Sequence, residues 1–145
     1  MDMNTADQYL KAIYLVQQLE DGPASTGKIA DRLDVSPASA NEMVGKLESQ
    51  DLLEHEKYKG VDLTDDGIRQ ARAALQNYCI IERFLLQVLE VENFREEART
   101  LESVIDETVA ERLDTIIDRE SDCPDCFDAE GDVCERLETE IEAMD

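Results

Sequence analysis

Four cysteines are the residues of this chain whose type and spacing most directly indicate chemistry. Cys123 and Cys126 form a C-x2-C pair, Cys134 follows eight residues later, and Cys79 lies far upstream. Where thiols stay reduced, such spacing more often holds a metal than a disulfide. Three thiolates and a fourth ligand can bind tetrahedral Zn²⁺ or an iron–sulfur cluster. We therefore predict one of these at Cys123, Cys126 and Cys134, with Cys79 as a weaker candidate ligand.

The same thiols are compatible with two other interpretations. The loop cysteines could form a reversible dithiol switch, or they could be free thiols in a flexible tail. Cys79 lies on an apolar helix face and fits a buried small hydrophobic residue better than a ligand. His55 is the single histidine and is expected to be solvated. Because the chain has no nucleophile–base pattern, we do not expect an enzyme.

A second group of short side chains falls at the start of a predicted helix. Ser36 is a suitable N-cap and Pro37 suits the first turn, and they are followed by Ala38, Ser39 and Asn41. DNA-binding motifs reach base edges and phosphates from this end of a helix. Asparagine can pair with adenine and alanine can contact a thymine methyl group, so these five residues are candidate DNA contacts.

Basic residues support the same interpretation. All five lysines fall before residue 61, although the chain as a whole is acidic. We expect four of them, together with a neighbouring tyrosine, to lie against DNA phosphates: Lys28, Lys46, Lys57, Lys59 and Tyr58. An ordinary solvated surface is the alternative. Because few counterions would be released, binding should persist at high salt.

The elements that position these residues form a helix-turn-helix with a wing. Apolar residues recur at helical spacing, and caps, glycine and proline mark the ends of the helices. The pattern predicts helices over residues 6–19, 25–33 and 36–50, then a hairpin of strands 52–56 and 61–63. Two short helices, a tight turn, a third helix and a hairpin are typical of a winged helix-turn-helix, here over residues 1–64.

The second half is helical and amphipathic. Apolar faces run over residues 68–89 and 98–117, and the second of these helices is broken near Asp106. Such helices cannot enclose a core alone, so we predict an all-helical dimerisation domain over residues 65–119 and a homodimer that binds a two-fold operator. Core packing within a monomer is the alternative. Residues 120–145 are expected to form an acidic, cysteine-containing loop and tail, and the fold class is mainly α.

The net charge and the hydropathy indicate in what kind of organism and compartment the protein works. The 145 residues include 14 Lys plus Arg against 36 Asp plus Glu, a net charge of −22. Such acidity without an acidic repeat is typical of extreme halophiles, because molar salt screens the repulsion between carboxylates. An acidic protein of an ordinary organism is the alternative. No apolar run approaches the roughly 20 residues of a membrane span and no signal peptide is evident, so we expect a cytoplasmic protein without membrane contact.

Several runs of the sequence are similar to one known family, the DtxR/MntR iron- and manganese-dependent transcriptional repressors. Residues 36–44 resemble the family's recognition helix, and residues 56–64 resemble its wing. Residues 82–85 resemble the start of its dimerisation segment, and residues 98–113 resemble the helices that follow. The resemblance implies a dimeric, sequence-specific DNA-binding transcription regulator, a repressor that responds to iron or another transition metal.

The metal ligands of that family are not all present. Among the positions where the resemblance places them, only Glu82 and Glu102 match. The positions that differ are Gln8, Lys11, Tyr78, Arg95, Arg99 and Ser103. Two carboxylates cannot fill the roughly six positions that Mn²⁺ or Fe²⁺ prefers, so we do not expect Fe or Mn at this site. Arg99 could instead reach a neighbouring carboxylate and replace the cation.

The sequence is compatible with several signals to which such a regulator could respond. A sensor role favours an iron–sulfur cluster over zinc at the cysteines, because three ligands leave an iron open to chemistry. A thiol-redox-responsive regulator is the alternative within the same class. From other classes, the alternatives are a metal-independent architectural protein that coats DNA and a winged helix that binds protein.

Overall fold

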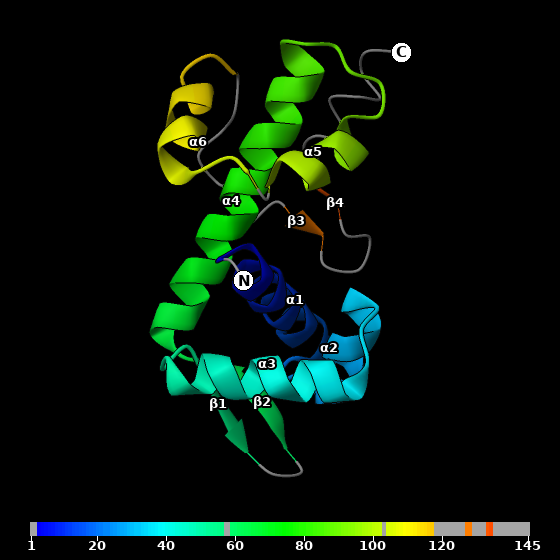
Figure 1. Ribbon diagram of the computed structural model, residues 1–145, viewed down its shortest axis with the longest axis vertical. Coiled ribbons are helices and arrows are strands. Elements are labelled where there is room, and N and C mark those ends of the chain that lie inside the picture. The colour runs from blue at the N-terminus through cyan, green and yellow to red at the C-terminus, as the bar shows by residue number, and fades with distance from the viewer. Residues whose placement is uncertain (1–2, 57–58, 103, 118–126, 129–132, 135–145) are drawn as a thin grey trace. The chain divides into compact units, whose positions relative to one another are not determined.

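The computed structural model describes residues 3–56, 59–102, 104–117, 127–128 and 133–134 (Figure 1). The chain divides into two compact units, Met1–Ala74 and Leu75–Asp145. The mainly α fold class, with a winged helix-turn-helix followed by helices, is confirmed. Over the described residues, no helix combines the length and the apolar character needed to cross a bilayer.

The first unit consists of three helices and a hairpin, followed by the start of a long helix. Its elements are α1 (Met3–Glu20), α2 (Thr26–Leu33), α3 (Pro37–Ser49), β1 (Leu53–Glu56), β2 (Gly60–Leu63) and the first turns of α4 (Asp65–Gln87) (Figure 1). The predicted helices and hairpin are confirmed, although α1 begins three residues earlier than expected. Only three residues separate α2 from α3, which is the tight turn of a helix-turn-helix.

Short polar side chains fix the ends of these helices. Ser25 Oγ accepts a hydrogen bond from Lys28 N at 3.1 Å, and Ser36 Oγ accepts one from Ser39 N at 3.1 Å. Asp34 ends α2 in the left-handed conformation, with φ 55°, which aspartate adopts more readily than most residues. The two serines satisfy backbone N–H groups that the first helical turn leaves without an intrahelical partner.

The core of the first unit surrounds α1. Leu10 and Ile13 have no exposed surface, and Lys11 between them is only 9% exposed. The buried residues come from all three helices, the wing and the start of α4: Tyr9, Leu10, Ile13, Val16, Ala24, Ile29, Ala30, Ala40, Val44, Leu47, Leu52, Leu53, Val61 and Ala71. Because α1 contacts α2, α3 and β2, it determines which face of α3 remains exposed.

β1 and β2 form the antiparallel wing, with Glu56 opposite Gly60 beside the turn. Val61 and Ala24 exchange N–H to C=O hydrogen bonds of 2.8 Å in both directions, which ties the wing to the segment between α1 and α2. Gly60 has φ +109°, and a Cβ atom there would lie 2.5 Å from Ala24 O. Glycine is therefore required where the wing passes this segment.

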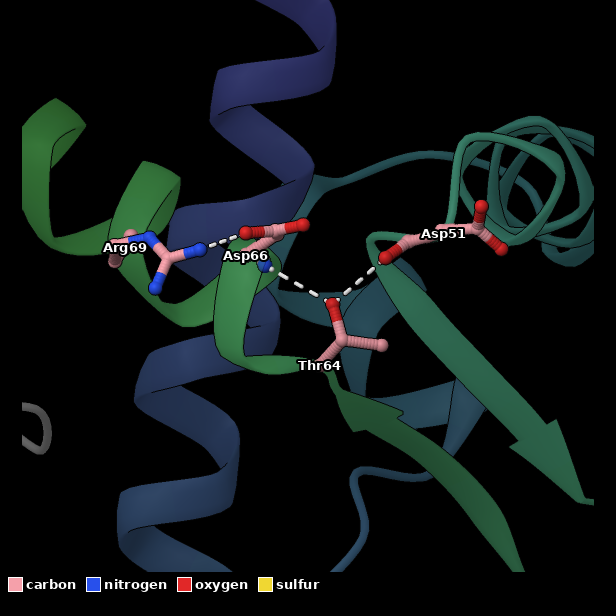
Figure 2. A network of polar contacts seen from close by, with 5 residues as sticks. Asp51, Thr64, Asp66 and Arg69 are labelled. Carbon is pink, nitrogen blue, oxygen red and sulfur yellow. Dashed lines mark hydrogen bonds and ion pairs between the residues drawn. The ribbon is translucent and has the colours of Figure 1, made fainter.

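Thr64 joins the wing to α4 (Figure 2). Its hydroxyl donates to Asp51 O at 2.8 Å and accepts from Gly67 N at 3.1 Å, so it caps α4 and at the same time bonds the turn between α3 and β1. Asp66 in the first turn of α4 forms an ion pair with Arg69. The negative charge of Asp66 also lies at the positive end of the helix dipole.

The second unit contains the rest of α4, α5 (Phe94–Glu102), α6 (Glu107–Asp114) and a two-stranded ladder of β3 (Phe127–Asp128) and β4 (Val133–Cys134). The predicted break at Asp106 is confirmed, since its Oδ1 accepts from Val109 N at 2.9 Å and caps α6. A small core joins α4 to α5, and its buried residues are Tyr78, Cys79, Ile81, Leu85, Phe94 and Ala98.

Two expectations for the chain after residue 64 are corrected, and one apolar residue of α4 is exposed. α4 ends at Gln87, so Leu89 lies beyond it and is 54% exposed. Ile68 belongs to the apolar pattern of α4 but is 37% exposed, because an apolar position is buried only where another element covers it. Phe127 pairs with Cys134 in a ladder where a loop was expected. The rest of the expected loop and tail lies outside the described residues.

Candidate nucleic-acid interface

Helix α3 buries one face and exposes the other. Ala40, Val44 and Leu47 are buried at helical spacing and hold α3 against the core of the first unit. The exposed residues at its N-terminal end are Ser36, Pro37, Ala38, Ser39, Asn41 and Glu42. The side chains expected to contact DNA thus project from the start of α3, away from the core.

The two serines at this end of α3 are bonded to each other, whereas the Asn41 amide is available. Ser36 Oγ donates to Ser39 Oγ at 3.0 Å while it accepts from Ser39 N. Asn41 is exposed, and its amide forms no hydrogen bond within the part of the chain that the structure describes. An asparagine amide carries a donor and an acceptor side by side, which matches the edge of adenine in the major groove.

Each exposed lysine that the structure describes is ion-paired with a glutamate. The pairs are Lys28 with Glu20, Lys46 with Glu42 at 3.9 Å, and Lys59 with Glu56 at 3.4 Å between nitrogen and oxygen. All three lysine side chains are more than half exposed, so the pairs are weak and can open. A phosphate that binds one of these lysines therefore has to displace a carboxylate.

The structure describes four of the five lysines and the single histidine. Lys11 is buried in α1, the central helix of the unit, so the five lysines do not share one face. Lys57 and Tyr58, expected at the wing tip, lie outside the described residues. His55 is exposed on β1, and its backbone N–H donates to Glu48 Oε2 at 3.0 Å.

A separate cluster of charged residues lies in the second unit. The Glu82 side chain is 3% exposed, and its Oε2 lies 3.7 Å from Arg95 Nε. The Arg95 guanidinium lies over the Phe94 ring, 5.0 Å from the centroid. The Tyr78 hydroxyl donates to Arg95 O at 3.4 Å. A carboxylate and a phenol on α4 are thus joined to an arginine on α5.

Burial and three nearby charges act on the pKa of Tyr78. Burial raises the pKa of Tyr78 well above its ordinary value, and the negative charges of Glu82 and Glu102 act in the same direction. The Arg99 charge and its hydrogen bond to the phenol oppose this rise in the pKa. Tyr78 is therefore a neutral phenol with two carboxylates and an arginine close enough to shift its titration.

Five of the positions where the resemblance places metal ligands belong to the charged cluster on α4 and α5: Tyr78, Glu82, Arg95, Arg99 and Glu102. Among the residues that the structure describes, no three His, Cys, Asp or Glu side chains come together in a way that could hold a metal ion. Glu82 contacts Arg95, and Glu102 belongs to α5. Gln8 belongs to α1, and Ser103 lies outside the described residues.

The structure describes two of the four cysteines, Cys79 and Cys134. Cys79 is a thiol outside any disulfide, 2% exposed, in the core of the second unit. The backbone of Cys134 belongs to β4. Cys123 and Cys126 lie outside the described residues, so the predicted metal or cluster site stays a prediction.

The chain is a winged-helix DNA-binding regulator. Its winged helix-turn-helix exposes the outer face of the recognition helix α3, and a helical unit follows. Two family models match it: "Iron dependent repressor, N-terminal DNA binding domain" over residues 1–61, and "Iron dependent repressor, metal binding and dimerisation domain" over residues 64–127. The chain belongs to the iron-dependent repressor family. The resemblance to DtxR/MntR repressors is thereby confirmed, and members of this family are transcriptional regulators and not enzymes.

Individual relatives agree with the family. An HTH-type transcriptional regulator of Methanocaldococcus jannaschii is 30% identical over 118 residues, which are 80% of this chain and 94% of that protein. MntR of Listeria welshimeri is 34% identical over 85 residues, 59% of each chain. The structure of ScaR with bound Zn²⁺ is similar with a TM-score of 0.69 and 31% identity, over 88% of this chain and 61% of ScaR. The chain thus spans about three-fifths of the length of MntR and of ScaR.

Proposed function

We propose that this protein is a homodimeric, sequence-specific transcription regulator that represses genes by occupying an operator in double-stranded DNA. The observation that carries the proposal is the exposed N-terminal end of α3. In helix-turn-helix proteins this end of the recognition helix lies in the major groove. Asn41 would discriminate bases and Ala38 would contact a thymine methyl group, while Ser36 and Ser39 would bind phosphate and Pro37 would fix the first turn.

Lysines on either side of α3 would hold the DNA backbone. In the proposed complex these contacts come from α2, α3 and the wing: Lys28, Lys46, Lys57, Lys59 and Tyr58. Lys46 and Lys59 would exchange a glutamate for a phosphate, so little net ion release accompanies binding. Together with the net charge of −22, this supports a protein that binds DNA in the salt-rich cytoplasm of a halophile.

Exposed apolar side chains of the second unit support the homodimer. Outside its core, the second unit has large apolar residues that are 43% to 74% exposed: Val88, Leu89, Val104, Val109 and Ile116. A single copy covers none of them fully, and a second copy is the commonest partner for such a surface. A two-fold dimer presents two α3 helices, and the operator should be a palindrome with half-sites separated by whole helical turns.

Selection of bound fragments from random DNA in molar KCl, followed by footprinting, tests this function. The expected result is one palindromic sequence with two protected half-sites. Protection without sequence preference would support the architectural alternative. No binding at any salt concentration would support a winged helix that binds protein.

The input proposed for this regulator is iron status, read through Cys123, Cys126 and Cys134. The ladder register supports this, because Cys134 lies opposite Phe127, the residue that directly follows Cys126 in the sequence. Anaerobic purification followed by a visible spectrum and iron, sulfide and zinc analysis tests the input. Iron and sulfide lost in Cys126→Ser would support a cluster, whereas stoichiometric zinc would make the loop structural. A metal-free protein whose DNA affinity changes on thiol oxidation would instead be a redox switch.

A further inference from the structure

The cluster around Glu82 lies in the part of the chain that matches a metal-binding and dimerisation domain. The Glu82 side chain is 3% exposed, and a carboxylate removed from water is unfavourable unless an opposite charge compensates it. Arg95 on α5 supplies that charge, with Nε 3.7 Å from Glu82 Oε2. The same guanidinium also lies over the Phe94 ring, 5.0 Å from its centroid.

Two carboxylates and two guanidinium groups lie near Tyr78 and Glu82. Glu82 and Glu102 contribute two negative charges, and Arg95 and Arg99 contribute two positive charges. The phenol of Tyr78 links the arginines, because it donates to Arg95 O and accepts from Arg99. A divalent ion at this place would add two positive charges beside two guanidinium groups.

The ligand chemistry leads to the same conclusion. Mn²⁺ and Fe²⁺ prefer about six ligands, mainly carboxylates, imidazoles and water. Over residues 5–56, 59–102 and 104–117, no three potential ligands of this kind come together. The Glu82 oxygen that could bind a metal already faces a guanidinium.

We propose that Arg95 and Arg99 act as built-in cations that replace a divalent metal in the second unit. They neutralise Glu82 and Glu102 and connect α5 to α4, so the unit folds without a metal at these residues. The part of this inference that concerns DNA rests on the proposed function: operator binding does not require Mn²⁺ or Fe²⁺ at Glu82. Regulation then has to act elsewhere in the chain.

Mn²⁺ added to the full-length protein is the direct probe, because this ion prefers oxygen ligands to thiolates. The chain is first treated with a chelator, and the Tm and the operator affinity are then measured with and without Mn²⁺. We expect no rise in Tm and no change in affinity. A rise in Tm or a tenfold gain in affinity that is lost in Glu82→Gln would overturn the inference.

Variants of the arginines provide the second test. Arg95→Met removes the guanidinium 3.7 Å from the buried carboxylate and should lower Tm by about 5–10 °C. The control is Arg69→Met on α4, the helix that carries Glu82; it breaks an exposed pair with Asp66 and should change Tm by less than about 2 °C. Arg95→Glu adds a third carboxylate, and Mn²⁺ should raise the Tm of this variant while leaving the wild type unchanged. Equal Tm values for Arg95→Met and Arg69→Met would contradict the inference.

These readouts separate the inference from the proposed function. If no DNA sequence is bound under any condition, the proposed function fails, while the Tm and Mn²⁺ measurements still decide the role of the arginines. If Arg95→Met does not fold, the Mn²⁺ titration of the wild type remains decisive.

Discussion

Removal of a glutamate that pairs with a lysine should tighten DNA binding and make it more sensitive to salt. Glu42→Gln removes the carboxylate 3.9 Å from Lys46 Nζ, and Glu56→Gln removes the one 3.4 Å from Lys59 Nζ. When the wild type binds DNA, each lysine moves from its glutamate to a phosphate. The phosphate releases a salt cation, and the freed glutamate takes one up, so the two effects offset each other. In the variants this compensation is lost, so the net release of ions on binding increases.

The size of the effect follows from the number of pairs. A dimer contains two copies of each, so each variant should steepen the plot of log K against log salt by up to about 1.8, or about 60-fold for a tenfold rise in salt. An exposed ion pair contributes roughly 0.2–1 kcal/mol. The loss of two competing carboxylates should therefore strengthen binding at the lower end of the salt range by roughly 2- to 30-fold.

Fluorescence anisotropy of a labelled operator across a series of KCl concentrations measures both quantities. Glu54→Gln is the matched control, because Glu54 is exposed on β1 and forms no ion pair with any residue that the structure describes. This variant removes a negative charge from the wing without releasing a lysine. If Glu42→Gln and Glu56→Gln change the salt slope no more than Glu54→Gln does, the lysines do not exchange carboxylates for phosphates and the reasoning is refuted.

Three further predictions concern stability, and urea unfolding in molar KCl measures each of them. Gly67→Ala should lower the free energy of unfolding by about 2 kcal/mol or more, because a Cβ atom there would lie 2.0 Å from Leu52 O; a variant as stable as the wild type would contradict this close approach. Thr64→Ala should cost about 1 kcal/mol through the lost cap and the lost bond to Asp51 O, and Thr64→Ser should recover most of it. Asp34→Gly should raise the free energy of unfolding by about 0.5 kcal/mol, because glycine carries no penalty at φ 55°; a loss of stability would show that the aspartate side chain matters there.

Local interactions explain why most of the first unit could be predicted from the sequence. Ser36 and Thr64 cap helices because each bonds a backbone N–H three residues ahead, so sequence neighbours decide the outcome. Asp106 marks the start of α6 for the same reason. The pair of Glu42 and Lys46 could also have been predicted, since residues four apart meet on a helix surface.

Tertiary packing decides the features that the sequence did not indicate. Lys11 is buried because α1 lies at the centre of its unit, and its own neighbours give no sign of this. Glu82 and Arg95 lie on different helices, so their spacing in the sequence does not predict a contact. They meet only because α5 packs against α4. The sequence indicated Arg99 as a cation beside a neighbouring carboxylate, but it gave no sign of the 3.7 Å contact between Arg95 Nε and Glu82 Oε2.

The central claim is that α3 reads bases through Asn41. The most direct measurement compares wild type and Asn41→Ala on the selected operator and on operators in which each A·T pair of the half-site is replaced in turn. The wild type should lose about 1–3 kcal/mol, or about 5- to 150-fold in affinity, at one A·T pair, and Asn41→Ala should not distinguish that pair. Gln18→Ala, which removes an exposed amide from α1, should behave like the wild type. If Asn41→Ala discriminates at every position as well as the wild type does, the claim is contradicted.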